Sequence, residues 1–134
     1  MSNLINLLDT YKGEKRELYP LTPSQMGVYL SCMHNPKGTM YNIPCTYVFD
    51  SGSLDTDRLI NAVRKTVDNH PVMKIFIDNS TGSPMMKPRD SVEFDIPVVQ
   101  VDNLEQAGKD FVKPFELEKD VLFRFAIFEC GDKS

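Results

Sequence analysis

The stretch LDTDRLINAVRKTVDNHPVMKIFI, residues 54–77, sets the architecture of the chain, because it predicts one helix followed directly by one strand. Asp55 is a good N-cap, since its carboxylate can accept the free backbone N–H groups of the first helical turn. Pro71 ends the helix, because a proline disfavours helical geometry at the preceding residue, His70. The strand that follows, 72–77, is rich in β-branched and aromatic residues. The apolar stripe of the helix recurs at helical spacing and comprises Leu59, Ala62, Val63, Thr66 and Val67.

Length and composition describe an ordinary globular domain. The 134 residues are 41% hydrophobic and 25% charged, enough for one modest core. A net charge of -4 argues against a nucleic-acid binder, which would need a basic face. The apolar runs are too short to span a bilayer, and no signal peptide is visible. We therefore expect a cytoplasmic protein that contacts neither nucleic acid nor membrane.

The cysteines and the carboxylates predict no metal or disulfide chemistry. Cys32, Cys45 and Cys130 are widely spaced and odd in number, which fits reduced, partly buried thiols and not a disulfide framework or a zinc site. The Asp and Glu residues are spread over solvent faces. No carboxylate pair, nucleophile elbow or glycine-rich phosphate loop is present in the sequence.

A second helix is predicted from residue 23 to about residue 34. Thr22 is its N-cap, and Pro23 occupies the first helical position, where its missing N–H costs nothing. Gln25 completes a capping box with Thr22. Asn35-Pro36 closes the helix. Its predicted apolar stripe comprises Met26, Tyr29, Leu30 and Met33.

Several shorter elements surround these two helices. A strand is predicted over 45–49, and Asn79 to Gly82 reads as a hairpin turn with Gly82 free to take a positive φ. Met85 to Lys87 is the return strand, and the prolines that bracket it, Pro84 and Pro88, favour an edge position or a short strand. Residues 89–97 are expected to be polar and irregular.

The C-terminal part predicts a strand, a helix and a further strand. Val98 to Val101 is a short strand, and Glu105 to Lys113 is a weak helix that contains Gly108. The last strand, 121–128, is apolar on both faces except for Arg124, which indicates the interior of a sheet. At the other end of the chain, residues 3–11 predict a short amphipathic helix, whose apolar positions are Leu4, Ile5, Leu7, Leu8 and Tyr11.

Four segments, in the right order, resemble sequences of the condensation domains of nonribosomal peptide synthetases. Residues 22–29 are similar to Ser-x-Ala-Gln-x-Arg-(Leu/Met)-(Trp/Tyr). Residues 41–44, Tyr-Asn-Ile-Pro, are typical of the family after its first helix. Residues 69–77 are similar to Arg-His-x-x-Leu-Arg-Thr-x-Phe, and residues 115–124 to Pro-Phe-(Asp)-Leu-x-x-x-Pro-Leu-Phe-Arg. The chain departs from these patterns at Gly27, where the family usually has arginine, and at Asn69, Lys74 and Ile77.

The resemblance implies an α/β fold, an α+β two-layer sandwich in which helices pack on a mixed β-sheet. This would be half of a chloramphenicol-acetyltransferase-like fold. Residues 1–18 would be an N-terminal amphipathic helix and linker, and residues 19–134 the N-terminal subdomain of a condensation domain, truncated before its catalytic motif. The helix of 3–11 either packs back on the domain or frays, and the alternative is a docking segment for an upstream synthetase.

What the resemblance implies for function is amide-bond formation between carrier-bound aminoacyl and peptidyl thioesters. The partners would be carrier protein domains bearing 4'-phosphopantetheine and the remainder of the synthetase, with no cofactor bound by this chain. The family's signature, His-His-x-x-x-Asp-Gly, supplies a histidine near the attacking amine. It is absent here, so we assign no catalytic, cofactor-binding or metal-binding residue and expect the chain alone to be inactive.

The sequence also allows other functions. The chain could instead be a non-catalytic module that docks a carrier protein or a synthetase. Heterocyclisation, epimerisation and plain acyltransferase relatives share the fold. The remaining histidines, His34 and His70, are expected to be structural residues at helix ends, and Ser24 has no partner histidine nearby. The apolar strand over 121–128 predicts a homodimer through an exposed sheet edge.

Overall fold

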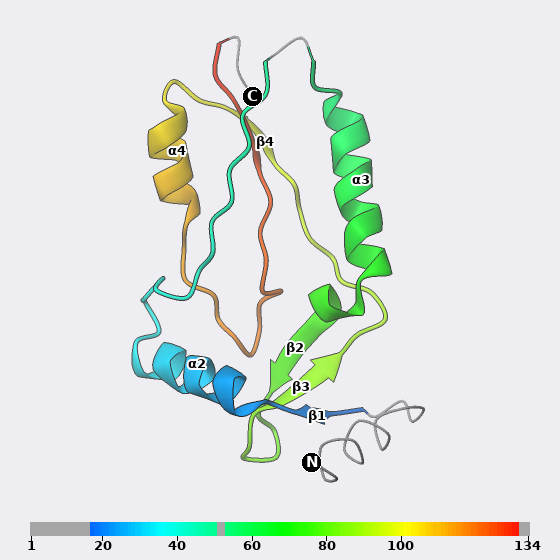
Figure 1. The fold of residues 1–134 in the computed structure, drawn as a ribbon, viewed down its shortest axis with the longest axis vertical. Coiled ribbons are helices and arrows are strands. Elements are labelled where there is room, and N and C mark those ends of the chain that lie inside the picture. The colour runs from blue at the N-terminus through cyan, green and yellow to red at the C-terminus, as the bar shows by residue number, and fades with distance from the viewer. Residues whose placement is uncertain (1–16, 51–52, 132–134) are drawn as a thin grey trace, which may run out of the picture.

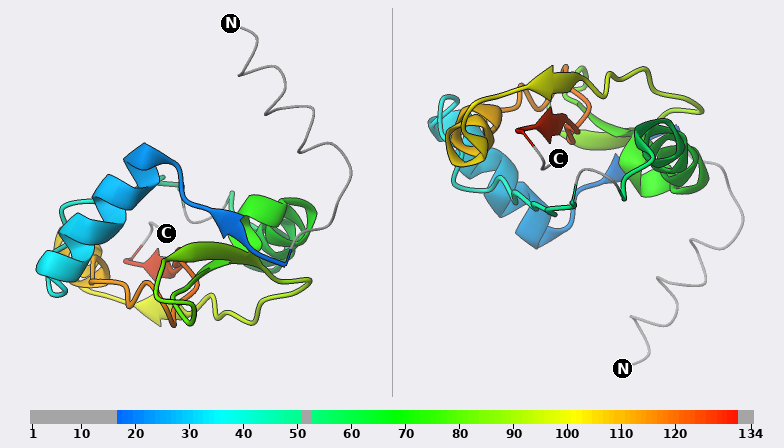
Figure 2. Two further views of the ribbon diagram at one scale, coloured as in Figure 1. Left: turned by 90° about the horizontal axis from the view of Figure 1, so that it is seen from below. Right: turned by 90° about the horizontal axis from the view of Figure 1, so that it is seen from above.

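The computed structural model describes residues 17–50 and 53–131, and these residues fold as three α-helices and two small sheets. The helices α3 (Thr56–Asn69) and α4 (Leu104–Phe111) stand on opposite sides of the molecule, with strands β4 (Val98–Gln100) and β5 (Ile127–Glu129) between them (Figures 1 and 2). The α/β class is therefore confirmed. The predicted helix over 3–11 and the tail at 132–134 lie outside the described residues.

The first sheet is antiparallel and has three strands in the order β1-β3-β2. Strand β2 (Ile75–Asp78) and strand β3 (Met85–Pro88) form the predicted hairpin, and Gly82 takes a φ of 82° in its turn, a conformation that favours glycine. The prediction of a short β3 is confirmed, but its alternative, an edge position, is wrong. Strand β1 (Tyr19–Pro20) pairs with the free side of β3, so β3 is the central strand.

The second sheet is a parallel pair, in which Val98 lies opposite Ile127. The predicted strand over 98–101 and the predicted helix over 105–113 are confirmed with small shifts of their ends. The N-cap of α4 is Asn103, whose side chain accepts the backbone N–H of Gln106 at 3.0 Å. The predicted single mixed sheet is thus divided into one antiparallel and one parallel sheet in the described chain.

Helix α3 begins as the sequence predicts. The Asp55 carboxylate accepts the Arg58 N–H at 2.9 Å, and Val67 on the apolar stripe is fully buried. The strand after the helix starts later than predicted, because residues Pro71–Lys74 form a 3₁₀ turn. The Lys74 side chain stabilises this turn by donating to the backbone carbonyls of Asp68 and Asp90, both at 2.9 Å.

Helix α2 (Pro23–His34) has the predicted capping box, in which Thr22 and Gln25 bond each other's backbone N–H groups at 3.3 and 2.8 Å. Its predicted apolar stripe is only partly buried. Tyr29 is 5% exposed, whereas Leu30 and Met33 are exposed to solvent. The helix therefore packs on the rest of the described chain through a narrow contact.

Of two predicted strands, one is absent from the described structure and the other is shortened. Residues 45–49 run as an irregular segment across the molecule, and only the last three residues of the apolar run 121–129 form a strand, β5. The prediction over 45–49 and the first part of the prediction over 121–128 are wrong for the same reason. A strand requires a continuous ladder of hydrogen bonds with a neighbour, and of these two segments only 127–129 has one in the described chain, while Asp50 and Cys130 form an isolated bridge.

The core is small. Four residues are buried in the described chain: Tyr29, Val67, Phe76 and Ile127. A partly exposed aromatic cluster supplements them, in which the Phe94 ring meets the Phe123 ring edge-on at 5.0 Å. Phe94 belongs to the region predicted to be polar and irregular. Every second residue of this stretch is apolar and half-buried, so residues 89–97 pack partly against the core. These residues are Val92, Phe94 and Ile96.

Candidate functional site: the Arg124 loop and its apolar pocket

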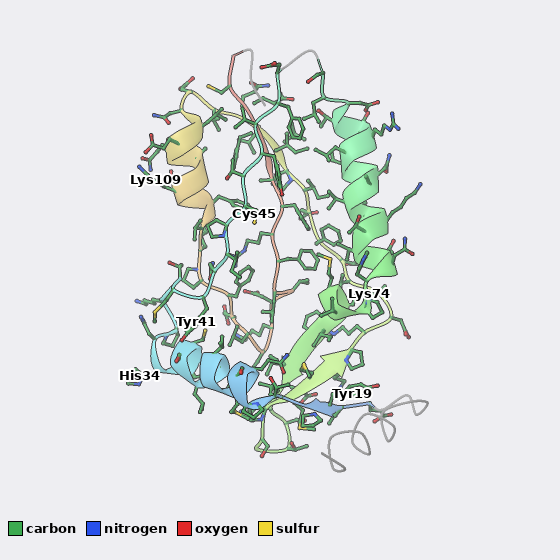
Figure 3. The ribbon with its side chains drawn as sticks, viewed as in Figure 1. Tyr19, His34, Tyr41, Cys45, Lys74 and Lys109 are labelled. Atoms are coloured by element: carbon green, nitrogen blue, oxygen red, sulfur yellow. The ribbon has the colours of Figure 1, made fainter. Side chains whose placement is uncertain are left out.

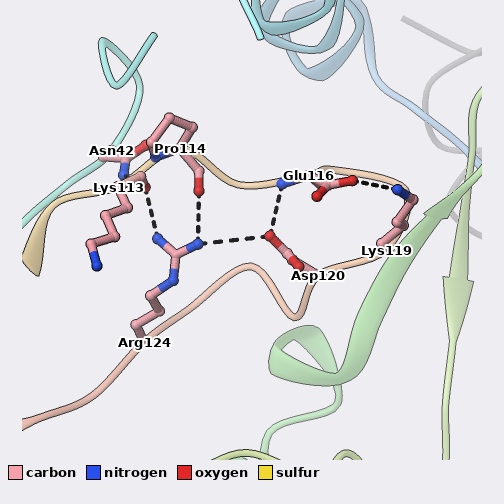
Figure 4. Close-up of polar contacts among 7 residues, drawn as sticks. All are labelled: Asn42, Lys113, Pro114, Glu116, Lys119, Asp120 and Arg124. Atoms are coloured by element: carbon pink, nitrogen blue, oxygen red, sulfur yellow. Dashed lines mark hydrogen bonds and ion pairs between the residues drawn. The ribbon is translucent and has the colours of Figure 1, made fainter. Parts of the chain in front are cut away.

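A polar network forms around Arg124 (Figure 4). Its guanidinium donates to the carbonyl oxygens of Lys113 and Pro114, each at 2.7 Å. The same group lies 3.7 Å from the Asp120 carboxylate and 3.9 Å from the centre of the Phe115 ring. Residues 113–124 therefore close around one side chain, and we name this segment the Arg124 loop.

The tip of the Arg124 loop is a turn that holds itself together. The backbone N–H groups of Lys119 and Asp120 both donate to the Glu116 carbonyl at 2.8 Å, and the Asp120 carboxylate accepts the Glu116 N–H at 2.8 Å. The Lys119 ammonium lies 2.5 Å from the Glu116 carboxylate, which raises the pKa of Lys119. Both of these side chains are largely exposed, so their ion pair contributes little stability.

The Arg124 loop joins two other parts of the chain. The Asn42 side chain donates to the same Lys113 carbonyl that Arg124 binds, at 2.8 Å. On the other side the Tyr29 hydroxyl of α2 donates to the Glu118 carboxylate at 2.6 Å. This hydrogen bond, together with burial of the ring and the negative charge of Glu118, raises the pKa of Tyr29 to about 12.

These segments enclose an open apolar pocket of about 740 Å³. Its walls come from α2, from the connection after α2, from the end of α4 and from the Arg124 loop. Its apolar lining residues include Val28, Met33, Ile43, Phe111, Phe115 and Leu122. Two cations line the pocket, and both are paired: Arg124 with two carbonyls and a carboxylate, and Lys119 with Glu116. The pocket therefore offers mainly apolar surface.

The histidines do not meet at this pocket. The ring of His70 lies 2.7 Å, through Nδ1, from the Thr66 carbonyl, which confirms its predicted contact with the last turn of a helix. His34 is the last residue of α2 and is exposed (Figure 3). Ser24 is an exposed residue in the first turn of α2. The structure thus brings none of these side chains together.

The described residues also contain no group of three or more His, Cys, Asp or Glu side chains that could hold a metal ion. Cys45 is exposed, and Cys32 and Cys130 are partly buried; all three are free thiols. Among the helices of the described residues, none is both long and apolar enough to cross a bilayer.

Sequence reasoning missed the role of Arg124 and the pairing of Tyr29 with Glu118. A single arginine in an otherwise apolar run, 121–128, was the available signal, since such a charge must find partners when its surroundings are buried. The identity of its partners carried no sequence signal, because backbone carbonyls exist at every residue. The partner of Tyr29 is 89 positions away, beyond any local pattern.

The sequence matches the family described as "Condensation domain" over residues 15–134. The chain belongs to the condensation domain family. Among curated relatives, bacitracin synthase 3 of Bacillus licheniformis is 30% identical over 124 residues, which cover 91% of this chain and 2% of that protein. Surfactin synthase subunit 2 of Bacillus subtilis (strain 168) is 26% identical and is matched over 86% of this chain and 3% of its own length.

Solved condensation domains share the fold described above. The starter condensation domain of rhizomide synthetase RzmA superposes with a TM-score of 0.73 at 18% identity, over 88% of this chain and 30% of that one. The four-domain nonribosomal peptide synthetase holo-AB3403, bound to AMP and glycine, gives a TM-score of 0.76 at 14% identity, over 95% of this chain and 10% of that one. The chain therefore corresponds to a fragment of the condensation domains and synthetases that it resembles.

Proposed function

We propose that this chain is the N-terminal part of a condensation domain that, when complete, joins two carrier-bound thioesters through an amide bond. The observation that supports this proposal is the family match over residues 15–134, nearly the whole chain. In the reaction the amine of one aminoacyl thioester attacks the carbonyl carbon of the other thioester. A C–N bond forms, the C–S bond breaks, and the amine proton ends on the departing thiolate.

That reaction needs a side chain that can orient the amine or accept its proton near neutral pH, which is a task for histidine. The two histidines of this chain, His34 and His70, are not adjacent in sequence, and each lies at the C-terminal end of a helix. We infer that the catalytic histidine comes from polypeptide outside these residues. The proposed contribution of this chain is a scaffold, in which the Arg124 loop fixes one wall of the apolar pocket.

The partners of such a domain follow from the same proposal. They are carrier protein domains, whose 4'-phosphopantetheine arm brings the thioester, and the remainder of the synthetase. The cofactor would arrive on the carrier as part of the substrate. We also propose a cytoplasmic location, since amino acids and carrier proteins of this kind are loaded there. Whether the reaction is condensation, heterocyclisation or epimerisation depends on residues around the missing signature.

The DNA that follows codon 134 in the source genome tests the proposal. We expect an open reading frame that continues and encodes His-His-x-x-x-Asp-Gly shortly after Ser134. A stop codon directly after Ser134, with the same frame transcribed and translated, would contradict the proposal. That result would favour the non-catalytic docking module instead.

A further inference from the structure

A second pocket, which is polar, lies on the hairpin of β2 and β3. It is open to solvent and has a volume of about 510 Å³, a size typical of small-molecule sites. Phe76 of β2 and Lys87 of β3 lie opposite each other in the register, and Arg89 follows directly after β3. We name this site the hairpin pocket. The charged side chains that line it are Asp78, Lys87, Arg89 and Glu118.

The side chain of Arg89 is held in place but has no polar partner. Its guanidinium carbon lies 3.3 Å from the centre of the Phe76 ring, which is itself buried. The backbone N–H of Arg89 donates to the Lys74 carbonyl at 2.9 Å, which fixes the chain at this point. Within the described residues, the Arg89 side chain forms no hydrogen bond or ion pair. A stacked guanidinium therefore offers its N–H donors in the planar fork that matches a carboxylate.

The two acids of the hairpin pocket already have other partners. The Asp78 carboxylate accepts the backbone N–H of Ser80 at 2.9 Å and lies 3.3 Å from the Lys87 ammonium. The Glu118 carboxylate accepts the hydroxyl of α2 described above. Neither acid forms an ion pair with Arg89 in the part of the chain that the structure describes. Arg89 is thus the one cation of this pocket that is left unpaired.

The charges of the hairpin pocket favour a monoanion as its ligand. A single unpaired cation is balanced by one negative charge, whereas a dianion such as phosphate meets stronger repulsion from Asp78 and Glu118. A carboxylate also accepts two parallel hydrogen bonds from one guanidinium. We propose that the hairpin pocket binds a small carboxylate, with Arg89 as its bidentate donor and the half-exposed Lys87 as a second positive charge in the same pocket.

NMR of the Arg89 side chain is the first measurement. The 134-residue chain is titrated with sodium acetate at constant ionic strength, and the Arg89 Nε–H signal is identified by its absence from the spectrum of Arg89→Gln. We expect this signal to shift saturably, with a dissociation constant in the millimolar range. Acetamide, which keeps the shape of acetate without its charge, should cause no saturable shift. An acetate shift that does not saturate, or an equal response to acetamide, overturns the proposal.

Inorganic phosphate tests the class of ligand in the same experiment. We expect phosphate to bind more weakly than acetate at neutral pH, because of the acids in the hairpin pocket. Phosphate that shifts the Arg89 signal at a lower concentration than acetate overturns the assignment of a carboxylate.

Variants separate a formed site from general charge attraction. Arg89→Gln should weaken acetate binding about fivefold or more, and Arg89→Lys should stay about threefold weaker than the natural chain, because an ammonium lacks the parallel donors. Arg58→Gln is the matched control, since Arg58 is also exposed and forms no hydrogen bond or ion pair through its side chain in the described structure. It should leave the affinity within a factor of about two. Equal effects of Arg89→Gln and Arg58→Gln overturn the proposal.

The longer reading frame that contains this chain tests whether the hairpin pocket stays open. Saturation-transfer difference NMR observes the methyl signal of acetate and suits a large protein. We expect a transfer signal that Arg89→Gln removes and Arg58→Gln retains. Absence of that signal from the longer protein would show that other residues of the polypeptide fill the hairpin pocket, and would overturn the proposal.

Discussion

Replacement of Arg124 by alanine should destabilise the chain by about 2–3 kcal/mol. The side chain makes two charge-assisted hydrogen bonds at 2.7 Å, and such bonds are worth about 1.5–3 kcal/mol each when buried. Its side chain is 32% exposed, which lowers this value, and the ion pair with Asp120 at 3.7 Å adds little. Loss of the arginine removes the hydrogen bond to the Pro114 carbonyl, whereas the Lys113 carbonyl still accepts a hydrogen bond from the Asn42 side chain.

The assay is urea unfolding followed by far-UV circular dichroism. Arg124→Lys should recover less than half of the loss, because an ammonium cannot reproduce the planar pair of donors that reaches two successive carbonyls. Arg58→Ala is the matched control, since Arg58 is exposed and its side chain forms no hydrogen bond or ion pair in the described part of the chain. It should change stability by less than about 0.5 kcal/mol.

Hydrogen exchange shows whether Arg124 stabilises only the Arg124 loop or the whole fold. Arg124→Ala should accelerate exchange in the peptides that contain the Lys119 and Asp120 amides, both of which donate to Glu116 within the Arg124 loop. Exchange in α3 should change less. A loss of stability below about 0.5 kcal/mol, or full recovery by lysine, would refute the view that the guanidinium holds this loop.

Three further predictions concern single side chains. The pKa of Tyr29 is raised from 10.0 to about 12, so its hydrogen bond to Glu118 contributes fully to folding stability below pH 10, and this contribution is lost as the pH rises towards 12. In urea unfolding, the free energy of unfolding of the natural chain should fall by about 1–2 kcal/mol relative to that of Tyr29→Phe over this pH range. A difference between the two proteins that does not change with pH would contradict this. His70→Ala should cost about 0.5–1.5 kcal/mol through the lost contact with the Thr66 carbonyl, and in the parent synthetase a large loss of turnover with normal folding would refute a structural role. Gly82→Ala should destabilise the hairpin by about 1 kcal/mol because of its φ of 82°, and a neutral or stabilising result in thermal unfolding would be inconsistent with that turn.

Local chemistry explains which elements could be predicted from the sequence. The capping box of Thr22 and Gln25, the N-cap at Asp55 and the positive φ of Gly82 each depend on residues within four positions of one another, so their signals survive in the sequence. The strands over 45–49 and 121–126 failed for the opposite reason. Strand propensity reflects how well a side chain packs in a sheet, and in the described chain these segments form no continuous ladder beyond the isolated bridge at Asp50 and Cys130.

The candidate site was less predictable than the fold. The resemblance identified the segment that ends at Arg124, but the partners of Arg124 are backbone carbonyls and carry no residue signature. The contacts of Asn42 with Lys113 and of Tyr29 with Glu118 bridge 71 and 89 positions. Such contacts are set by how the helices and loops meet in space, which a single sequence does not encode locally.

The most direct test of the central claim compares this chain with the reading frame that contains it. Both proteins are incubated with the same loaded carrier proteins, and amide products are followed by mass spectrometry. We predict amide product from the longer protein and none above the no-enzyme rate from residues 1–134, because these residues lack the paired histidines of the signature. Amide formation by the 134-residue chain alone would contradict the account.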